Sequence, residues 1–404
     1  MSEPNAPSEY VRLAFLIDQH LSGYVDAYYG PEEWKPTIST GAKPPIAALE
    51  DLTHSLEEAI STDPTLTPSR SAYLSEELRA MRTTIRILGG NTTDIVDEVE
   101  CLFGVTPKWV DESVFAEAHA ALKEVLPGPE PLRERVLDFR KRSRIPVEVA
   151  APMIRDLVDD LRGRARLLFD LPPREECEVS FVRDKSWLAY NWYLGHRKSL
   201  IEFNQDFPME VWRLPSILAH ESYPGHHAEH AIKEHRLYRE EGRLEHSILL
   251  NNTPASFISE GIAQNALEAV ASEAEIVSIL TGCYERTGLP KSDAARAMDF
   301  FQAYRRLDKV ADNQVLLLYR EHPPDEEIIA YGVRHALTDE DDESRGLRFY
   351  KDPLWRSYTY NYTLGRELIA EFLRVAGDKT TAFQRLLSEP CTPTQIRQSV
   401  TSPN

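Results

Sequence analysis

The chain has 404 residues, of which 42% are hydrophobic and 27% charged, and its formal net charge is −19. This composition is typical of a globular protein with a sizeable core, and so acidic a surface repels phosphate backbones, which argues against nucleic acid as a partner. No apolar run approaches the length of a membrane span, and the first residues lack a basic segment followed by an apolar one, so we expect neither a membrane span nor a signal peptide.

Apolar residues recur at helical spacing through most of the chain. In the helix predicted over 253–271, Thr253 is the expected N-cap and Pro254 occupies the first turn. The acidic run at 339–343 is expected to be a solvated loop. The other predicted helices span residues 44–60, 72–88, 150–169, 291–320 and 361–376.

The region between Glu178 and Asn204 has a different pattern. Residues 178–182, 186–194 and 198–204 are rich in aromatic and β-branched side chains, and turn-like pairs separate these three segments. The pattern predicts a small antiparallel sheet of three strands.

The order of the predicted elements suggests two parts. Residues 1–172 form a helical N-terminal lobe, and residues 173–404 form a second lobe with the sheet, the motif helices and a helical tail. One continuous domain remains the alternative. In either case the predicted class is mainly α.

The stretch SILAHESYPGHHAEH at residues 216–230 holds four of the twelve histidines. It begins like the HExxH zinc motif, in which histidines at i and i+4 reach one metal from the same face of a helix. Here the i+4 position is Pro224. On a straight helix His226 would lie about 240° around the axis from His220, and His227 about 10 Å further along.

Pro224 and Gly225 indicate that this helix is not straight. Proline cannot donate to the carbonyl four residues earlier, and glycine accepts unusual backbone dihedrals. A bulge or break of two residues would bring His226 or His227 back beside His220. The residues alone do not choose between these two histidines.

A second motif overlaps the first. Residues 226–230 spell HxxEH, the inverted zinc motif, in which Glu229 stands before His230. This motif needs no distortion of the helix. It leaves His220, Glu221 and the Pro-Gly pair without a role.

A third ligand is expected on the helix over 253–271. Glu260 lies near the apolar stripe of that helix, and Gly261 beside it permits close approach of another segment. A carboxylate on a largely apolar face needs a partner, and a metal ion is a suitable one.

HESYPGHH followed by SEG resembles an uncharacterised bacterial family of zincin-like metallopeptidases marked by HExxPGHH and a downstream EGW. The resemblance runs from about Tyr190 to Arg366 and includes a tyrosine-x-x-glycine element at Tyr362. It implies a helical, zincin-like metallopeptidase fold with a small antiparallel sheet beside the active-site helix. The metal ligands that it implies are His220, His226 and Glu260, with Glu221 as general base.

This chain also departs from the family pattern. Ile262 replaces the family's tryptophan, and the segment at Asp312 lacks the expected histidine. The family usually has glutamine at the position of Glu229, which weakens the inverted motif. The chain is also short for the family. These differences bear on the identity of the substrate more than on metal binding.

These observations predict a metal-dependent hydrolase, a zinc peptidase or amidohydrolase acting on a peptide or small amide. Glu221 would deprotonate a metal-bound water, and Tyr362 or Arg366 would stabilise the oxyanion. Manganese or cobalt suits the same ligands as zinc. The alternative is a noncatalytic or degenerate metal-binding protein of the same fold. A di-iron site is disfavoured because no histidine has glutamate three residues before it.

The four cysteines are widely spaced and form no CxxC pair. Such spacing is typical of reduced thiols rather than of a disulfide framework or a zinc ribbon. Together with the expected lack of a signal peptide, it predicts a cytoplasmic location.

Overall fold

The computed structural model describes residues 5–34, 42–91, 93–185 and 187–401. Within these ranges the protein is mainly helical and carries three small sheets, so the predicted class is confirmed. None of the helices described there is both long enough and apolar enough to cross a membrane. All four cysteines are free thiols.

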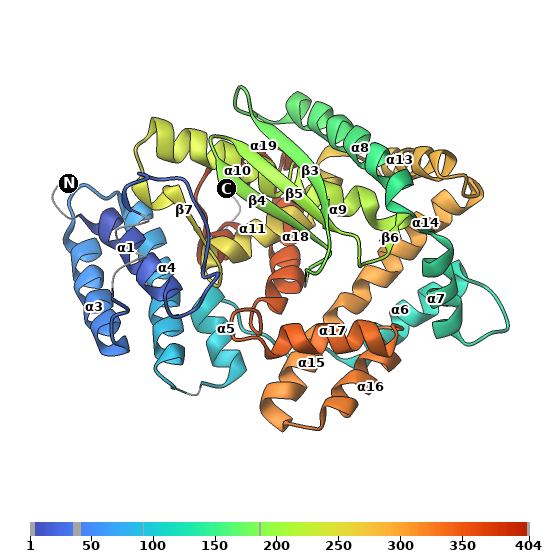
Figure 1. Cartoon of the computed structure of the whole chain (residues 1–404), viewed down its shortest axis with the longest axis horizontal. Helices are drawn as coiled ribbons and strands as arrows, with labels where there is room; N and C mark the ends of the chain where they lie inside the picture. The colour runs from blue at the N-terminus through green and yellow to red at the C-terminus, as the bar shows by residue number, and fades with distance from the viewer. Residues whose placement is uncertain (1–4, 35–41, 92, 186, 402–404) are drawn as a thin grey trace.

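The N-terminal part is almost entirely helical and contributes two short strands (Figure 1). Its elements are α1 (Ala6–Asp18), β1 (Val25–Tyr28), α3 (Ile46–Thr62), α4 (Pro68–Leu88), α5 (Ile95–Phe103), α6 (Glu112–Val125), α7 (Leu132–Arg142), β2 (Arg144–Ile145) and α8 (Val147–Leu168).

The central part holds the main sheet and the helices of the histidine motif. Its elements are β3 (Glu176–Val182), β4 (Ala189–Gly195), β5 (Lys198–Asn204), β6 (Met209–Glu210), η1 (Val211–Arg213), α9 (Leu214–Glu221), α10 (His226–Lys233), η2 (Glu234–Glu240), η3 (Leu244–Ser247), β7 (Ile248–Leu250), α11 (Pro254–Gln264) and α12 (Ala266–Val270).

The C-terminal part is helical throughout. Its elements are α13 (Glu273–Arg286), α14 (Ser292–Tyr304), η4 (Arg305–Lys309), α15 (Val310–Leu316), η5 (Leu317–Glu321), α16 (Asp325–His335), α17 (Glu340–Lys351), η6 (Asn361–Gly365), α18 (Arg366–Val375), α19 (Lys379–Ser388) and α20 (Pro393–Thr401).

The main sheet differs from the prediction in its topology. Its three strands lie where the aromatic segments predicted them, except that Ser186 falls outside the described residues. Their order is β3-β5-β4, with β5 antiparallel to β4 but parallel to β3. The sheet is therefore mixed, because the chain crosses over after β3 and only β4 and β5 form a hairpin, whose turn consists of His196 and Arg197.

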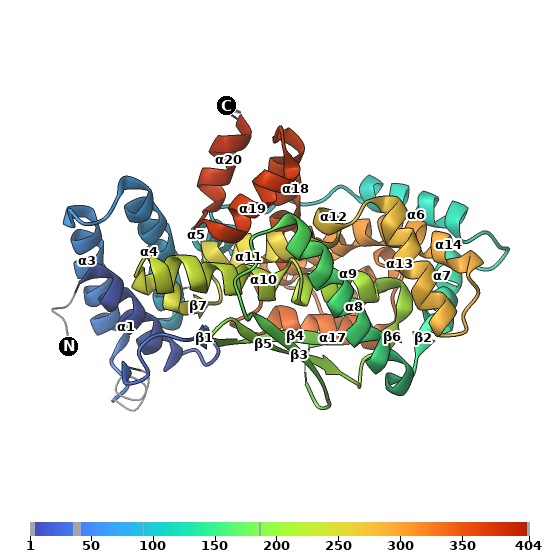
Figure 2. The ribbon, with the colours of Figure 1, turned by 90° about the horizontal axis from the view of Figure 1, so that it is seen from above.

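The sheet and the C-terminal helices lie on opposite sides of the motif helices. Figure 2 shows β3, β4 and β5 along one side of α9, α10 and α11, and α18 to α20 (red) rising from the other. Both α9 and α10 contact β4, and α11 packs on η6 and α18. The motif helices are thus covered on both sides, which fixes their side chains relative to one another.

Two large apolar cores and one small cluster stabilise the part of the chain that the structure describes. The smaller core joins α1, α3 and α4 to Ile248 and Leu250 of β7. The larger one runs from α4 to α20 and includes residues of α8, α9 and α11. The predicted lobe boundary after residue 172 stays a prediction.

Candidate metal centre

The motif helix is interrupted between α9 and α10. The amide of Gly225 donates to the carbonyl of Ala219 at 3.0 Å, and that of Ala228 to Ser222 at 3.2 Å. Each of these bonds spans six residues where a regular helix spans four. The expected insertion of two residues is therefore present, and Pro224, which has no amide hydrogen, lies inside it.

Only glycine fits at the junction. A Cβ atom on residue 225 would lie 2.0 Å from the carbonyl oxygen of His220 and 2.5 Å from that of Ala219. This contact lets α10 begin directly against the end of α9. The rings of His220 and His226 consequently meet edge to face, with centroids 4.7 Å apart.

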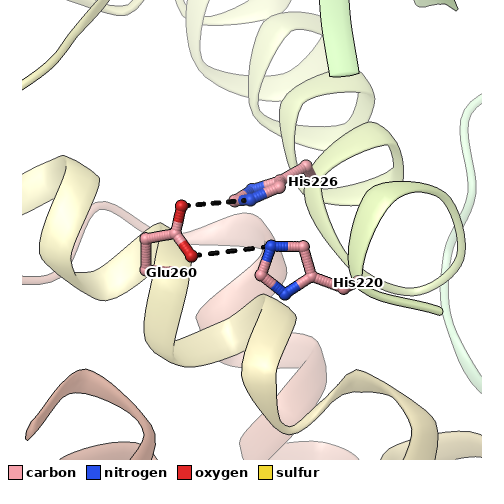
Figure 3. Close-up of side chains that lie close together, drawn as sticks. All are labelled: His220, His226 and Glu260. Carbon is pink, nitrogen blue, oxygen red and sulfur yellow. Dashed lines mark ion pairs between the residues drawn. The ribbon is translucent and has the colours of Figure 1, made fainter. Parts of the chain in front are cut away.

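Glu260 of α11 faces both histidines, as Figure 3 shows. The Nε2 atom of His220 lies 3.5 Å from one carboxylate oxygen, and the Nε2 atom of His226 lies 3.5 Å from the other. Ligand atoms about 2.1 Å from a tetrahedral zinc ion are separated by roughly 3.4 Å. The spacing of the three side chains therefore suits one zinc ion.

One oxygen of this carboxylate has no hydrogen-bond partner. Tyr358 donates to Oε1 of Glu260 at 2.9 Å, whereas Oε2 is buried and unpartnered among the described residues. A buried carboxylate oxygen without a partner is costly. A cation next to His220 would satisfy it, so the residues present fit a bound metal.

The charges at this site depend on burial and on Glu260. Burial lowers the pKa of His220 to about 4, which keeps this imidazole neutral and able to coordinate. Burial also acts to lower the pKa of His226, but the carboxylates of Glu260 and Glu221 outweigh it and raise that pKa to about 9. A metal ion at this position would therefore displace a proton from His226.

Glu221 ends α9 beside the two histidines. Burial, together with the charges of Glu260 and Asp26, raises the pKa of its carboxyl to about 7 although His226 opposes the shift. Its backbone carbonyl accepts a hydrogen bond of 2.6 Å from the Asn191 side chain of β4. The sheet thus fixes the end of α9, and the carboxyl has a pKa suited to exchanging protons near neutral pH.

A serine orients the second histidine. Ser259 donates to Oε2 of Glu229 at 2.6 Å, so its oxygen accepts from Nδ1 of His226, 3.1 Å away. The proton of the neutral ring is thereby held on Nδ1, which leaves Nε2 free to coordinate. Ser259 directly precedes Glu260, and no other pattern in the sequence indicates this role.

Replacing Ser259 by alanine is expected to weaken zinc binding by about tenfold or more, because metal affinity depends on the groups that hydrogen-bond to the metal ligands. Competition with a zinc-binding dye measures the change. Ser388 is also buried but bonds only to a backbone carbonyl of its own helix, so Ser388→Ala serves as the control and keeps the wild-type affinity. Equal affinities of the Ser259→Ala variant and the wild type would contradict the orienting role.

His227 points away from Glu260. Its ring lies 2.8 Å from the Ser199 hydroxyl and 3.2 Å from a carboxylate oxygen of Glu175. Tyr223 and Arg162 also donate to Glu175. Burial acts to raise the pKa of this carboxyl, but these donors hold it at about 2. His227 therefore anchors the interrupted helix to β5 and to the segment before β3.

The residues of the inverted motif also lie close together. Ligand atoms of His226, Glu229 and His230 lie close enough to share an ion. However, Glu229 already accepts from Ser259 and from the Lys233 ammonium, 2.6 Å away. A lysine this close neutralises the carboxylate and repels a cation, so the cluster with Glu260 is the better metal site.

The tyrosines near the C-terminus divide between the site and the core. Tyr358 and Tyr362 both face Glu260, and burial and the charge of Glu260 raise the pKa of each well above its usual value. Their hydroxyls therefore remain protonated donors. Tyr360 instead donates to the backbone carbonyl of Asp312 at 3.1 Å. Tyr358, four residues before Tyr362, is a site residue that the sequence did not single out.

Arg366 was expected to stabilise an oxyanion, and its position corrects that expectation. Its guanidinium pairs with Asp308 at 2.9 Å and also donates to the carbonyl of Arg305. It does not line the pocket at the histidines. The Arg366 side chain therefore contacts η4 rather than Glu260.

The three candidate ligands line a pocket of about 720 Å³. Asp26 of β1 and Tyr190 of β4 also line it, and the tyrosine hydroxyl donates to the aspartate. Neither residue belongs to a motif. Asp26 comes from the N-terminal part, far from the histidines in sequence, which is why sequence analysis missed it.

No protein family description matches the sequence, and no curated protein matches it. Four solved chains do share the fold. One is described as "the putative lipoprotein from Colwellia psychrerythraea", with a TM-score of 0.53 and 15% identity over 87% of this chain and 66% of that one. Another is "a putative lipoprotein of unknown function from Shewanella oneidensis", with a TM-score of 0.52 and 12% identity over 88% and 73%.

These comparisons correct two predictions. The chain was predicted to be a zinc peptidase or amidohydrolase, but the solved structures that share its fold are described as lipoproteins, one of them of unknown function. That functional prediction is wrong by this comparison and is withdrawn. The predicted cytoplasmic location is contradicted by the same finding and is withdrawn. At identities this low, the likeness itself establishes the fold alone.

Proposed function

We propose that this protein is a zinc-dependent enzyme whose ion is held by His220, His226 and Glu260. The observation that carries this proposal is the buried oxygen of Glu260 that accepts no hydrogen bond from the described residues and lies 3.5 Å from Nε2 of His220. Manganese or cobalt suits the same ligands. When bound, the ion supplies a Lewis acid that polarises an oxygen of the ligand in the pocket.

The chain's own residues supply the acid–base chemistry in this proposal. Glu221 accepts and returns a proton, for which a pKa of about 7 is well placed. Tyr362 lines the pocket and donates its hydroxyl hydrogen to negative charge that develops on the ligand. Tyr358 and Ser259 hold Glu260 and His226 in place through their hydrogen bonds.

We also propose that the arrangement is zincin-like. Three features support this view: two histidines flank the interruption of the helix, a carboxylate follows the first histidine, and a third ligand comes from a later helix. They also support the resemblance to the HExxPGHH family, which remains part of the proposal.

The Glu221→Gln variant tests the enzymatic part of the proposal. Glutamine keeps the shape of the side chain but cannot accept the proton, so we expect zinc content to be unchanged and turnover to fall by about a hundredfold or more. Zinc-loaded wild type and variant are incubated with a mixture of cellular metabolites, and mass spectrometry identifies compounds that only the wild type consumes. No compound consumed by the wild type, or equal consumption by both proteins, would contradict the proposal.

A further inference from the structure

The wall of the pocket contains an arginine with no acidic partner. Arg213 directly precedes α9 at its N-terminal end and lines the same pocket as His220. Arg213 forms no ion pair within the described ranges, because Asp308, the pocket carboxylate whose charge it influences, pairs with Arg366 instead. Its pocket neighbour Arg305 differs in this respect, because it pairs with Glu268.

Arg213 is the last residue of η1, directly before α9, and His220 is the second-to-last residue of α9. Seven residues of helix span roughly 10 Å along the axis. Ser216 and Ile217, between them, line the pocket as well. The helix therefore presents a cationic group about two turns from the proposed metal.

Aromatic side chains form the surroundings of Arg213. Its guanidinium lies 5.9 Å from the ring centre of Trp212, which in turn contacts Phe301 and Tyr304. A guanidinium held against a ring keeps its edge free to donate. This end of the pocket thus combines an apolar wall with a donor for a planar anion.

The opposite end of the pocket has acidic side chains. Asp26, Glu221 and Glu260 lie close enough to influence one another's charge. Without a bound cation they repel an anion. The distribution of charge along the pocket therefore directs the negative end of a ligand to Arg213.

We propose that the pocket binds an organic acid with an apolar body and two anionic ends, of which one carboxylate pairs with Arg213 while the other end faces the histidines. This inference rests on the proposed zinc centre for the position of that other end. A pocket of about 720 Å³ accommodates such a molecule.

Dicarboxylic acids of increasing length test the proposal. In suberate the terminal carbons are roughly 9 Å apart when extended, so one carboxylate reaches the metal and the other reaches Arg213. Calorimetry compares glutarate, suberate, sebacate and the monocarboxylate octanoate on zinc-loaded protein. We expect Arg213→Gln to weaken binding of the best dicarboxylate by about tenfold or more and to leave octanoate unchanged.

Arg142→Gln is the matched control, because Arg142 is exposed, pairs with Asp138 and lies outside the pocket. This variant removes the same charge, and we expect the affinities for the dicarboxylates and for octanoate to stay unchanged. Equal affinities of the wild type and Arg213→Gln for every dicarboxylate would overturn the inference.

Zinc content, measured in the same samples, separates this inference from the proposed function. A chain that takes up no zinc contradicts the proposed function. In that case the dicarboxylates and octanoate depend on Arg213 alone, so Arg213→Gln is expected to weaken the binding of both kinds of acid. An unchanged affinity again overturns the inference.

Discussion

Replacing His220 or Glu260 by alanine is expected to abolish stoichiometric zinc binding. Each change removes one of three ligands whose facing atoms are 3.5 Å apart. Loss of a hydrogen-bond partner of a ligand alone lowers metal affinity by about 10- to 100-fold. Loss of a ligand itself is therefore expected to lower the affinity by more than about a hundredfold. Elemental analysis after dialysis measures the bound zinc, and circular dichroism checks the fold.

Substitutions of the same residue types elsewhere provide the controls. His235 lies in η2 and faces Glu240, and Glu273 is exposed at the start of α13. His235→Ala and Glu273→Ala should each retain wild-type zinc content. If the two ligand variants kept their zinc as well, the ion would lie elsewhere and the assignment of this centre would fail.

Replacing Gly225 by alanine is expected to destabilise the fold by about 3 kcal/mol or more and to weaken zinc binding. The added Cβ would lie 2.0 Å from the backbone oxygen of His220, and a backbone atom cannot rotate away as the end of a flexible side chain can. Either α10 moves, which separates His226 from His220, or the end of α9 unwinds. Urea denaturation and a zinc titration measure the two effects.

Gly163 is the matched control for this substitution. It lies inside α8, and a Cβ there meets no atom within 4 Å. Gly163→Ala should therefore leave zinc binding unchanged and stabilise the protein by up to about 1 kcal/mol. Wild-type stability and zinc affinity in Gly225→Ala would show that the junction tolerates a side chain, contrary to the packing described above.

The sequence predicted those features that depend on local patterns. Thr253 caps α11, as its position indicated, because a cap is specified by a single residue. Pro224 and Gly225 correctly indicated an interruption of two residues. The choice of His226 over His227 needed the structure, since it depends on how the rejoined helix is rotated about its axis.

Features that depend on distant segments, and one local helix start, were missed or predicted wrongly. The parallel pairing of β3 with β5 arises from a crossover that strand patterns do not reveal. Asp339 caps α17, so the acidic run begins a helix rather than forming a loop, because acidic residues also stabilise helix starts. Asp26 reaches the pocket from β1, and no spacing in the sequence links it to the histidines.

The most direct test of the central claim is a crystal soaked in zinc and measured at the zinc absorption edge. We predict one strong anomalous peak, about 2.1 Å from Nε2 of His220, Nε2 of His226 and an oxygen of Glu260. Ligand atoms of His226, Glu229 and His230 form the competing cluster. A peak among those residues, or no peak near His220, would contradict the assignment.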